Sequence, residues 1–345
     1  MVQDIPVERL LELQARGDLA LIDVRSPSEF TESTIPGSVN IPLFDDAERA
    51  EIGTLYKQVG VDAAKQRGLE IVSAKLPAFI RAVDAADAPR KAVFCWRGGM
   101  RSKTSATLAS LMGIRMYRLQ GGFRAYRRWV VETLERMETE ALPPLYVING
   151  YTGTGKTELL DRLEAAGYPV INLEEMAQHR GSIFGHIGRA PNNQKTFESL
   201  LAHELIRYKD APYLLMEAES KRVGKVVLPD FLVRAKERGT VLFVEMPLEQ
   251  RVANILRDYR PETFKDDCIR SFAHIEKRIH TPIAARIRSA LADGRFDEAV
   301  ALLLEHYYDP RYEHASGQYE KDRIIVRAAD VDDAFARIAG LLPAP

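Results

Sequence analysis

The sequence predicts an α/β protein of two domains, each built around a parallel sheet. Three observations lead to this prediction: apolar strand segments alternate with helical segments, two of those strands run into glycine-rich loops that open helices, and a pair of prolines divides the chain. A chain of 345 residues is also longer than one average core needs. We expect one domain over residues 1–140 and a second over residues 141–345, with a helical C-terminal part.

The first domain alternates helices and strands from its start. Apolar residues between positions 7 and 15 have helical spacing, and Gly17 follows as a C-cap. Residues 19–24 and 91–94 predict buried strands, and residues 102–112 predict a helix that ends at Gly113. This order predicts a doubly wound parallel sheet, whose functional loops lie at the carboxyl ends of its strands, where Cys95 is found.

The second domain repeats this alternation after an acidic helix, expected over residues 132–140, from which Pro143 and Pro144 separate it. Strands are expected over residues 145–149, 168–172, 213–216 and 241–244. Residues 197–208 have an apolar helical face. His203 lies off that face, so we expect a solvated side chain there.

Cys95 lies in a loop whose composition indicates a reactive thiol. It is followed by Trp96, Arg97, Gly98, Gly99, Met100 and Arg101. Backbone N–H groups at a helix start and two arginines favour an anion, so the loop can stabilise a thiolate, a persulfide or a perselenide. The two glycines let the backbone curl around the sulfur.

The Cys95 loop also fits two other interpretations less well. The spacing Cys95-x5-Arg101 fits a tyrosine-phosphatase-type loop, but Phe94 stands where those enzymes generally carry histidine, and no aspartate stands out as a general acid. A buried structural cysteine is the simpler alternative, and the glycine- and arginine-rich surroundings argue against it.

The second glycine-rich loop is a complete phosphate-binding P-loop between a strand and a helix. Its members are Gly150, Gly153, Thr154, Gly155, Lys156 and Thr157. In this context the backbone N–H groups cradle a phosphate, the lysine neutralises it, and the threonine hydroxyl can bind Mg²⁺. Nucleotide-hydrolysing P-loop proteins also carry an aspartate at the end of a later strand. Glu217 takes that place here, either as a substitute or as a salt-bridge partner of Lys221 or Arg222, so the use of ATP and of Mg²⁺ stays open.

The bulk composition argues against several classes of protein. Cys95 and Cys268 are the only cysteines and form no Cys-x-x-Cys pair, so we expect neither structural zinc nor a disulfide framework. We also expect no metal-binding residues of the protein's own and no tightly bound cofactor, while Mg²⁺ use stays open. No apolar run is long enough for a membrane span, and the N-terminus lacks signal-peptide features, so we expect a cytoplasmic protein without a membrane span.

The charge is balanced overall but not locally. A net charge of −1 gives no global indication of nucleic-acid binding. Between residues 115 and 128, however, the chain carries arginines and aromatic residues without any acid. Such a stretch can neutralise phosphates and stack on bases, or it can be a solvated helix face. The candidate contacts are Arg118, Arg124, Arg127 and Arg128.

About the first 130 residues resemble the rhodanese family. The matching segments are residues 21–30 (LIDVRSPSEF), 35–42 (IPGSVNIP) and 119–123 (LQGGF), together with the Cys95 loop. This resemblance implies a rhodanese-like sheet in which Asp23 and Arg25 are structural and Cys95 carries a chalcogen. The remainder resembles a P-loop NTPase-like α/β domain.

Nearly the whole chain, with its domains in this order, resembles the bacterial tRNA 2-selenouridine synthases. Besides the two loops, the most specific segments are residues 53–58 (GTLYKQ), 179–185 (HRGSIFG), 219–224 (ESKRVG) and 307–312 (YYDPRY). The resemblance implies a transferase that acts in two steps on the wobble 2-thiouridine of the tRNA anticodon. Geranyl diphosphate first alkylates the base sulfur, giving S-geranyl-2-thiouridine, and selenophosphate then supplies selenium, giving 2-selenouridine. A selenophosphate-producing enzyme is then the selenium source.

The same resemblance implies roles for individual residues. The P-loop holds the diphosphate of geranyl diphosphate, Cys95 receives selenium or assists its delivery, and Arg97 and Arg101 can bind the phosphate of selenophosphate. The arginines of residues 118–128 become candidate tRNA contacts. Further candidate substrate contacts are His179, Arg180, Ser182, Glu217 and Arg222. On the residues alone, 179–182 is a structured loop in which Arg180 pairs with an acid. The tyrosines at 307, 308 and 312 can stack on bases, line a prenyl pocket or belong to the core.

Two other functions remain open. An ATP-dependent kinase or adenylating enzyme fused to a sulfurtransferase would hydrolyse nucleotide. A phosphate-sensing regulatory module would have an inert rhodanese unit, which the presence of Cys95 disfavours. The choice of tRNA, its docking surface and the oligomeric state are not fixed by the sequence.

Overall fold

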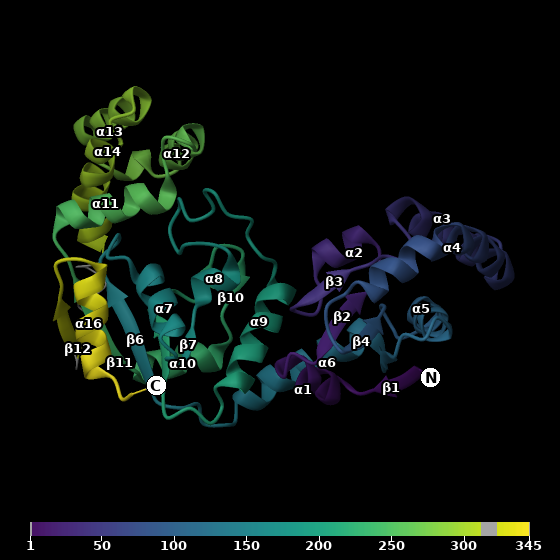
Figure 1. The fold of residues 1–345 in the computed structure, drawn as a ribbon. Coiled ribbons are helices and arrows are strands. Elements are labelled where there is room, and N and C mark those ends of the chain that lie inside the picture. Colours follow the sequence, from purple (N-terminus) through teal and green to yellow (C-terminus); the bar gives the residue numbers. More distant parts are fainter. Residues whose placement is uncertain (1, 312–322, 345) are drawn as a thin grey trace. The chain divides into compact units, whose positions relative to one another are not determined.

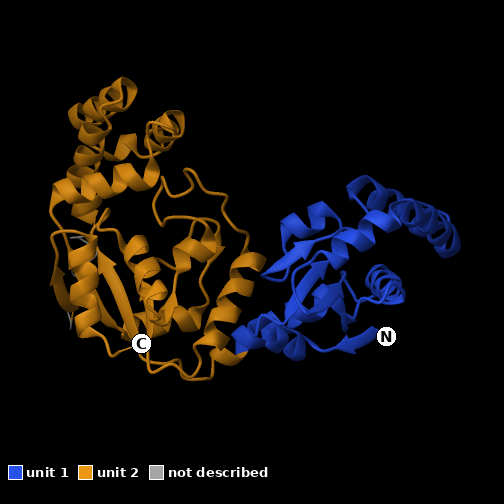
Figure 2. Cartoon of the chain, in the orientation of Figure 1, with its two compact units in different colours: residues 1–135 blue, residues 136–345 orange. Residues whose placement is uncertain are grey.

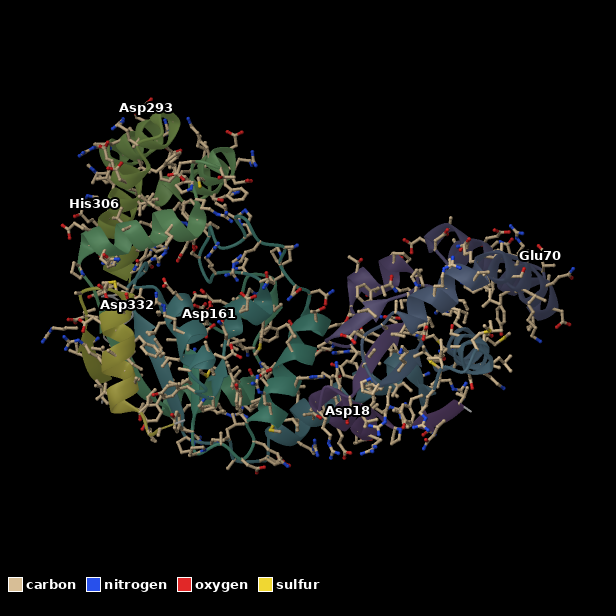
Figure 3. All side chains as sticks on the ribbon, viewed as in Figure 1. Asp18, Glu70, Asp161, Asp293, His306 and Asp332 are labelled. Carbon is tan, nitrogen blue, oxygen red and sulfur yellow. The ribbon has the colours of Figure 1, made fainter. Side chains whose placement is uncertain are left out.

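The computed structural model describes residues 2–311 and 323–344 of the chain. Its contacts divide into two compact units, Met1–Glu135 and Arg136–Pro345 (Figure 2). The division falls inside one helix, shortly before the boundary expected after residue 140. Charged side chains such as Glu70 and Asp293 lie on the outside of the units (Figure 3).

The first unit is a five-stranded parallel sheet with strand order β1-β5-β4-β2-β3 (Figure 1). Its strands are β1 (Val2–Ile5), β2 (Leu19–Asp23), β3 (Ser38–Asn40), β4 (Arg90–Phe94) and β5 (Met116–Leu119). Its helices are α1 (Val7–Ala15), α2 (Pro27–Glu32), α3 (Asp46–Gln58), α4 (Val61–Asp84), α5 (Met100–Leu111) and α6 (Gly122–Met137). Apolar side chains of β2, β4, α4 and α5 form one core, which includes Ile22, Val93 and Cys95.

The second unit is another five-stranded parallel sheet, with strand order β12-β11-β6-β8-β7. Its strands are β6 (Leu145–Gly150), β7 (Val170–Ile171), β8 (Leu214–Glu217), β11 (Thr240–Glu245) and β12 (Arg323–Arg327), and β9 (Arg222–Val223) pairs with β10 (Val226–Val227) in an antiparallel hairpin. The helices are α7 (Lys156–Ala165), α8 (Leu173–Ala177), α9 (Gln194–Arg207), α10 (Asp230–Arg238), α11 (Leu248–Tyr259), α12 (Lys265–Ala273), α13 (Thr281–Asp293), α14 (Phe296–Leu303) and α16 (Val331–Leu341). The unit also contains a 3-10 turn, η1 (Glu276–Arg278), and a π-helical turn, η2 (Leu304–Tyr308).

Two apolar clusters stabilise this unit. One lies around the sheet, where Ile148 and Leu160 pack with residues of β8, β11 and α16. The other lies among α12, α13 and α14, where Phe272, Ile287 and Ala299 are buried. The helical C-terminal part therefore has a core of its own, and the chain then returns to the sheet as β12.

The predicted α/β class with two parallel sheets is confirmed, and both glycine-rich loops follow the carboxyl ends of strands, β4 and β6. One prediction on a side chain was wrong. His203 is half-buried on α9, and desolvation lowers its pKa to about 4, because the apolar helical face is wider than the spacing indicated. In the described part of the chain, no helix combines the length and apolarity needed to cross a membrane.

Candidate functional site

The thiol of Cys95 lies at the base of its loop rather than on the surface. Cys95 is 3% exposed, and its Sγ lies 3.2 Å from the Ser102 hydroxyl, on the first turn of α5. Ser102 Oγ also lies 3.2 Å from the Gly99 carbonyl oxygen, to which it donates. Trp96 and Met100 are both exposed on the same loop. The loop therefore surrounds a buried sulfur with an apolar rim.

A second glycine turn holds this loop in shape. At the start of α6, Phe123 N donates to Cys95 O (2.8 Å), and Arg124 N donates to Trp96 O (2.9 Å). Gly122 has a φ of +61°, and a Cβ there would overlap the Cys95 carbonyl oxygen. The segment 119–123 is thus the backbone support of the thiol loop, and glycine is required in it.

A buried ion pair lies under the loop. Arg25 is 2% exposed, donates to Asp23 from Nε and Nη2, and lies 4.1 Å from the centroid of the Phe123 ring. The Phe123 ring also packs against Trp96 at 5.8 Å. Asp23 and Arg25 are therefore structural, as the rhodanese resemblance implied.

The arginines near Cys95 differ in what they contact. Arg101 binds Glu29 through two hydrogen bonds of 2.5 and 3.2 Å; burial alone would raise the pKa of Glu29, but Arg101 lowers it below the usual value. Arg118 pairs with Asp4 at 2.6 Å. Arg97, Arg124 and Arg128 are exposed, and Arg127 is half-buried. Arg97, Arg124 and Arg128 are therefore more accessible to an anion from solvent than Arg101, Arg118 and Arg127.

The P-loop has the backbone expected of a phosphate cradle. Gly150, Gly153 and Gly155 all have positive φ values, of +155°, +87° and +70°. Lys156 Nζ donates to the carbonyl oxygens of Gly150 (3.0 Å) and Tyr151 (3.2 Å). Thr154 is buried and donates to Tyr151 O (2.9 Å). The Lys156 ammonium lies over the loop. It donates only to neutral carbonyl oxygens here, and a phosphate oxygen, which is charged, can replace them as the acceptor.

Carboxylates lie beside the end of the P-loop. Thr157 Oγ1 donates to Glu174 Oε2 (2.6 Å), and Glu174 N donates to Glu217 Oε1 (2.6 Å). Glu217 is 2% exposed, its Oε2 has no hydrogen-bond partner among the described residues, and burial raises its pKa well above the usual value. Desolvation and the neighbouring Glu174 raise the pKa of Glu219 to about 7. The alternative of a Glu217–Lys221 salt bridge was wrong, because Lys221 pairs with Asp230.

Glu174 and Glu219 were missed as site residues by the sequence analysis. Glu174 could have been suspected, because it closely follows the carboxyl end of a strand. Within residues 2–311 and 323–344, no three His, Cys, Asp or Glu side chains are grouped to hold a metal ion. Carboxylate and hydroxyl oxygens are the ligands that Mg²⁺ prefers, and Glu174 and Thr157 supply one of each beside the P-loop.

Helix α11 fixes the P-loop from one side. Arg251 Nε donates to Thr152 O (2.8 Å), and Asn254 Nδ2 donates to Gly153 O (2.9 Å). Arg251 is itself held by Asp309, with hydrogen bonds of 2.9 and 2.5 Å. The buried Arg251 therefore supports the loop rather than projecting as a free cation.

The other candidate contacts have mostly structural surroundings. Arg180 donates to the carbonyl oxygens of Ile187 and Asp258 and lies over the Tyr259 ring, so its hydrogen bonds go to backbone rather than to an acid. The His179 ring packs against Gly185 and Gly224, and its buried Nδ1 finds no hydrogen-bond partner in the part of the chain that the structure describes. Ser182 contacts the Tyr259 hydroxyl at 3.1 Å. Arg222 is exposed on β9.

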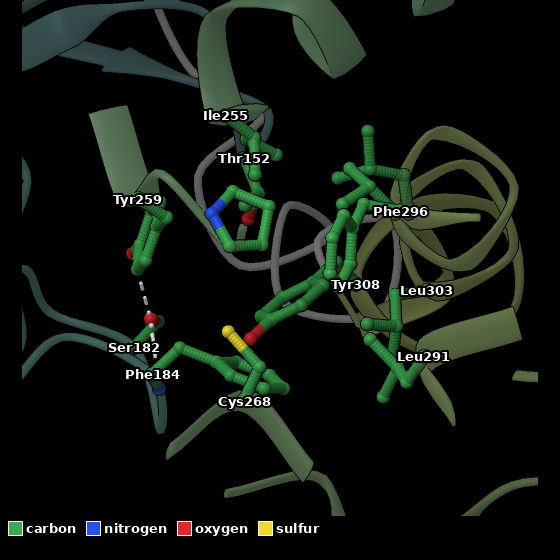
Figure 4. Close-up of a pocket in the computed structure, with 13 residues that line it drawn as sticks. Thr152, Ser182, Phe184, Ile255, Tyr259, Cys268, Leu291, Phe296, Leu303 and Tyr308 are labelled. Carbon is green, nitrogen blue, oxygen red and sulfur yellow. Dashed lines mark hydrogen bonds between the residues drawn. The ribbon is translucent and has the colours of Figure 1, made fainter. Parts of the chain in front are cut away.

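An apolar pocket of about 60 Å³ adjoins the P-loop (Figure 4). Thr152, a P-loop residue, and Tyr308 both belong to its lining (Figure 4). The remaining lining comes from the loop after α8, from α11 and the loop after it, and from α12, α13, α14 and η2: Ser182, Phe184, Ile255, Tyr259, Pro261, Cys268, Leu291, Phe296, Val300, Leu303 and Leu304. Tyr307 is buried in the adjacent core, and Tyr312 lies outside the described residues.

Comparisons with known proteins follow the two units. Residues 143–338 match a family model described as the tRNA 2-selenouridine synthase AAA domain, and residues 6–128 match the rhodanese-like domain. A tRNA 2-selenouridine synthase of Shewanella loihica is 34% identical over 93% of this chain and 93% of its own length. One of Bordetella petrii is 36% identical over 91% of this chain and 90% of its own.

Among solved structures, the N-terminal domain of a putative ATP/GTP binding protein from Clostridium difficile is 36% identical. The match covers 37% of the present chain and 99% of the chain in that solved structure, with a TM-score of 0.36.

Proposed function

Because the chain belongs to the tRNA 2-selenouridine synthase family, we propose that it converts wobble 2-thiouridine to 2-selenouridine in two steps, each at one of the glycine-rich loops. Membership of the family makes the chain an enzyme that acts on tRNA. The proposal adds the chemistry: geranyl transfer from geranyl diphosphate, followed by selenium transfer from selenophosphate.

The first step is assigned to the P-loop. The base sulfur bonds to C1 of the geranyl group as the C1–O bond breaks, pyrophosphate leaves, and the base loses its N3 proton. The leaving pyrophosphate gains charge, which Lys156 and the N–H groups of residues 153–157 can stabilise. A thiocarbonyl sulfur leaves poorly, whereas an alkylated sulfur leaves as a thiol, so this step prepares the next.

One observation carries this assignment: the phosphate cradle adjoins an apolar pocket through Thr152. A nucleotide base would need hydrogen-bond partners in that place, whereas a prenyl chain needs none. The pairing of a diphosphate site with an apolar site fits a prenyl diphosphate.

The second step is assigned to the Cys95 loop. Selenium bonds to C2 of the base, geranyl thiol leaves with the former sulfur, and water releases phosphate from selenium, so no outside oxidant or reductant is required. Cys95 assists the delivery of selenium, and the exposed Arg97 can bind the selenophosphate oxygens. Arg124 and Arg128 on α6 are available to tRNA phosphates near this loop.

Two variants and one measurement test whether each step takes place at its assigned loop. Lys156→Ala and Cys95→Ala are prepared as full chains, with Lys209→Ala, an exposed lysine, as the control for removal of charge. Each is given 2-thiouridine tRNA, geranyl diphosphate and selenophosphate, and the wobble nucleoside is analysed by mass spectrometry. Lys156→Ala should leave 2-thiouridine, and Cys95→Ala should accumulate S-geranyl-2-thiouridine. Wild-type geranyl transfer by Lys156→Ala, or loss of both steps in Cys95→Ala, would contradict the proposal.

A further inference from the structure

We propose that the apolar pocket beside Thr152 holds the hydrocarbon tail of the allylic diphosphate, and that its wall from α13 and α14 limits the length of the tail. This inference rests on the proposed function, because it supplies the second half of the same ligand site. The relevant wall residues are Leu291, Phe296 and Leu303.

The first argument is the chemistry of the lining. Burial raises the pKa of Tyr259 to about 12 and that of Cys268 to about 11, so both groups are uncharged at neutral pH. The Tyr259 hydroxyl and the Ser182 hydroxyl contact each other at 3.1 Å, and Figure 4 shows this bond at the side of the pocket. The remaining lining is almost entirely aliphatic and aromatic. An uncharged, apolar cavity of this kind selects a hydrocarbon.

The second argument is that one helix positions both halves of the site. Arg251, Ile255 and Tyr259 are spaced by four residues on α11, so they lie on one face of the helix. Arg251 holds the P-loop carbonyl of Thr152, and the other two line the pocket. The distance from the phosphate cradle to the pocket is therefore set by a rigid element rather than by a loop.

The third argument concerns the π-helical turn η2. This turn follows α14 directly and contains Leu304 and Tyr308, which line the pocket, and Asp309 follows it. Asp309 binds Arg251, so the turn links the wall of the pocket to the support of the P-loop. π-Helical turns are rare and are found frequently at functional sites.

The far wall is built to resist widening. Leu291, Phe296 and Leu303 are 4%, 8% and 7% exposed, and they belong to the buried cluster of α12, α13 and α14. Shortening one of these side chains leaves room that a longer tail can occupy, whereas a larger side chain at Cys268 removes room from the tail itself.

The experiment compares dimethylallyl, geranyl and farnesyl diphosphate as donors to 2-thiouridine tRNA. Leu303→Ala should raise the ratio of farnesyl to geranyl transfer by about tenfold or more. One methylene group in an apolar pocket changes the discrimination between two substrates by at least about tenfold. Cys268→Phe should lower geranyl transfer about tenfold while dimethylallyl transfer continues. Leu302→Ala is the matched control, because Leu302 is buried on the same helix but does not line the pocket.

The outcomes separate this inference from the proposed function. If both pocket variants keep the wild-type preference among the three donors while Lys156→Ala still abolishes transfer, the tail lies elsewhere and only the inference is overturned. If Lys156→Ala transfers geranyl at the wild-type rate, the proposed function itself fails. A changed donor preference in Leu302→Ala equal to that in Leu303→Ala would also overturn the assignment of the wall.

Discussion

In both units a parallel strand runs into a glycine-rich loop and then into a helix, but the two loops present different groups to a ligand. The Cys95 loop encloses a thiol that is 3% exposed, and one of its arginines, Arg101, is already paired with Glu29. The P-loop presents the Lys156 ammonium, whose hydrogen bonds go to carbonyl oxygens of its own loop. Under the proposed function, one backbone arrangement thus serves two chemistries, and the side chain at its base and the prior pairing of its cations select the anion that each loop binds.

The largest effect is expected when the backbone of only one loop is disturbed. Gly122→Ala should lower selenium transfer to S-geranylated tRNA by more than about a hundredfold, because a Cβ at a φ of +61° would overlap Cys95 O. Geranyl transfer by the same variant should be unchanged. Gly113→Ala is the control, because Gly113 also has a positive φ (+83°) but lies outside the loop, and a Cβ there meets nothing within 4 Å. Equal activity of the two variants in the selenium assay would show that the loop shape is not what matters.

The corresponding substitution in the P-loop is Gly153→Ala. Gly153→Ala places a Cβ 2.8 Å from Arg251 O at a φ of +87°, so geranyl transfer should fall about a hundredfold. Selenium transfer to S-geranylated tRNA should persist, which is measured with purified geranylated tRNA. Gly340→Ala, on α16 with open space around it, should behave as wild type in both assays. Loss of selenium transfer in Gly153→Ala would indicate that the loops do not act separately.

A smaller effect is expected from the support of the P-loop. Asp309→Asn weakens the partner of Arg251, which holds Thr152 O, so the KM for geranyl diphosphate should rise about tenfold with a smaller change in kcat. Selenium transfer to S-geranylated tRNA by the same variant should match wild type. Steady-state kinetics of both steps give the comparison, and a change confined to kcat would contradict a positioning role.

The smallest effect concerns acid stability. His203 has a pKa of about 4 in the folded chain, below its usual 6.5, so protonation favours the unfolded state as the pH falls from about 6.5 to 4. His203→Gln should remove about 1 kcal/mol of that destabilisation at pH 5.5, measured by denaturant unfolding at pH 5.5 and 8. The lowered pKa of Glu29 stabilises the folded state instead. Its pairing with Arg101 contributes stability above the ordinary pKa of a glutamate, and this contribution is lost as the pH falls toward the lowered pKa of Glu29 in the folded chain. An unchanged pH dependence in His203→Gln would contradict the buried neutral imidazole.

Much of the fold could be predicted because local patterns determine it. The strand before Cys95 and the strand before the P-loop lie within one residue of their predicted ranges, since apolar runs bounded by glycine loops are strong signals. The strand expected over residues 168–172 is only Val170–Ile171, because an edge strand has fewer pairing partners. Strand β12 was not predicted, and it forms only through its pairing with β11 far back in the chain.

The candidate site was predictable in part for the same reason. The two loops are contiguous in sequence, so their members could be named, and their roles in catalysis stay predictions. The pairing of Arg101 with Glu29 and of Arg251 with Asp309 depends on contacts across 72 and 58 positions of the chain, which no local pattern contains. The apolar pocket likewise gathers side chains from positions 152 to 308, and only Tyr308 among them had been suggested as a pocket residue.

The spacing of Arg251, Ile255 and Tyr259 on α11 has a consequence for how such chains can change during evolution. Substituting any of the three alters one contact, but inserting a single amino acid between the first two would rotate everything after it by about 100° around the helix axis. Ile255 and Tyr259, which line the apolar pocket, would then turn away from the side of the helix on which Arg251 supports the P-loop. Related sequences should therefore tolerate varied side chains along this helix while conserving its count of residues between those points.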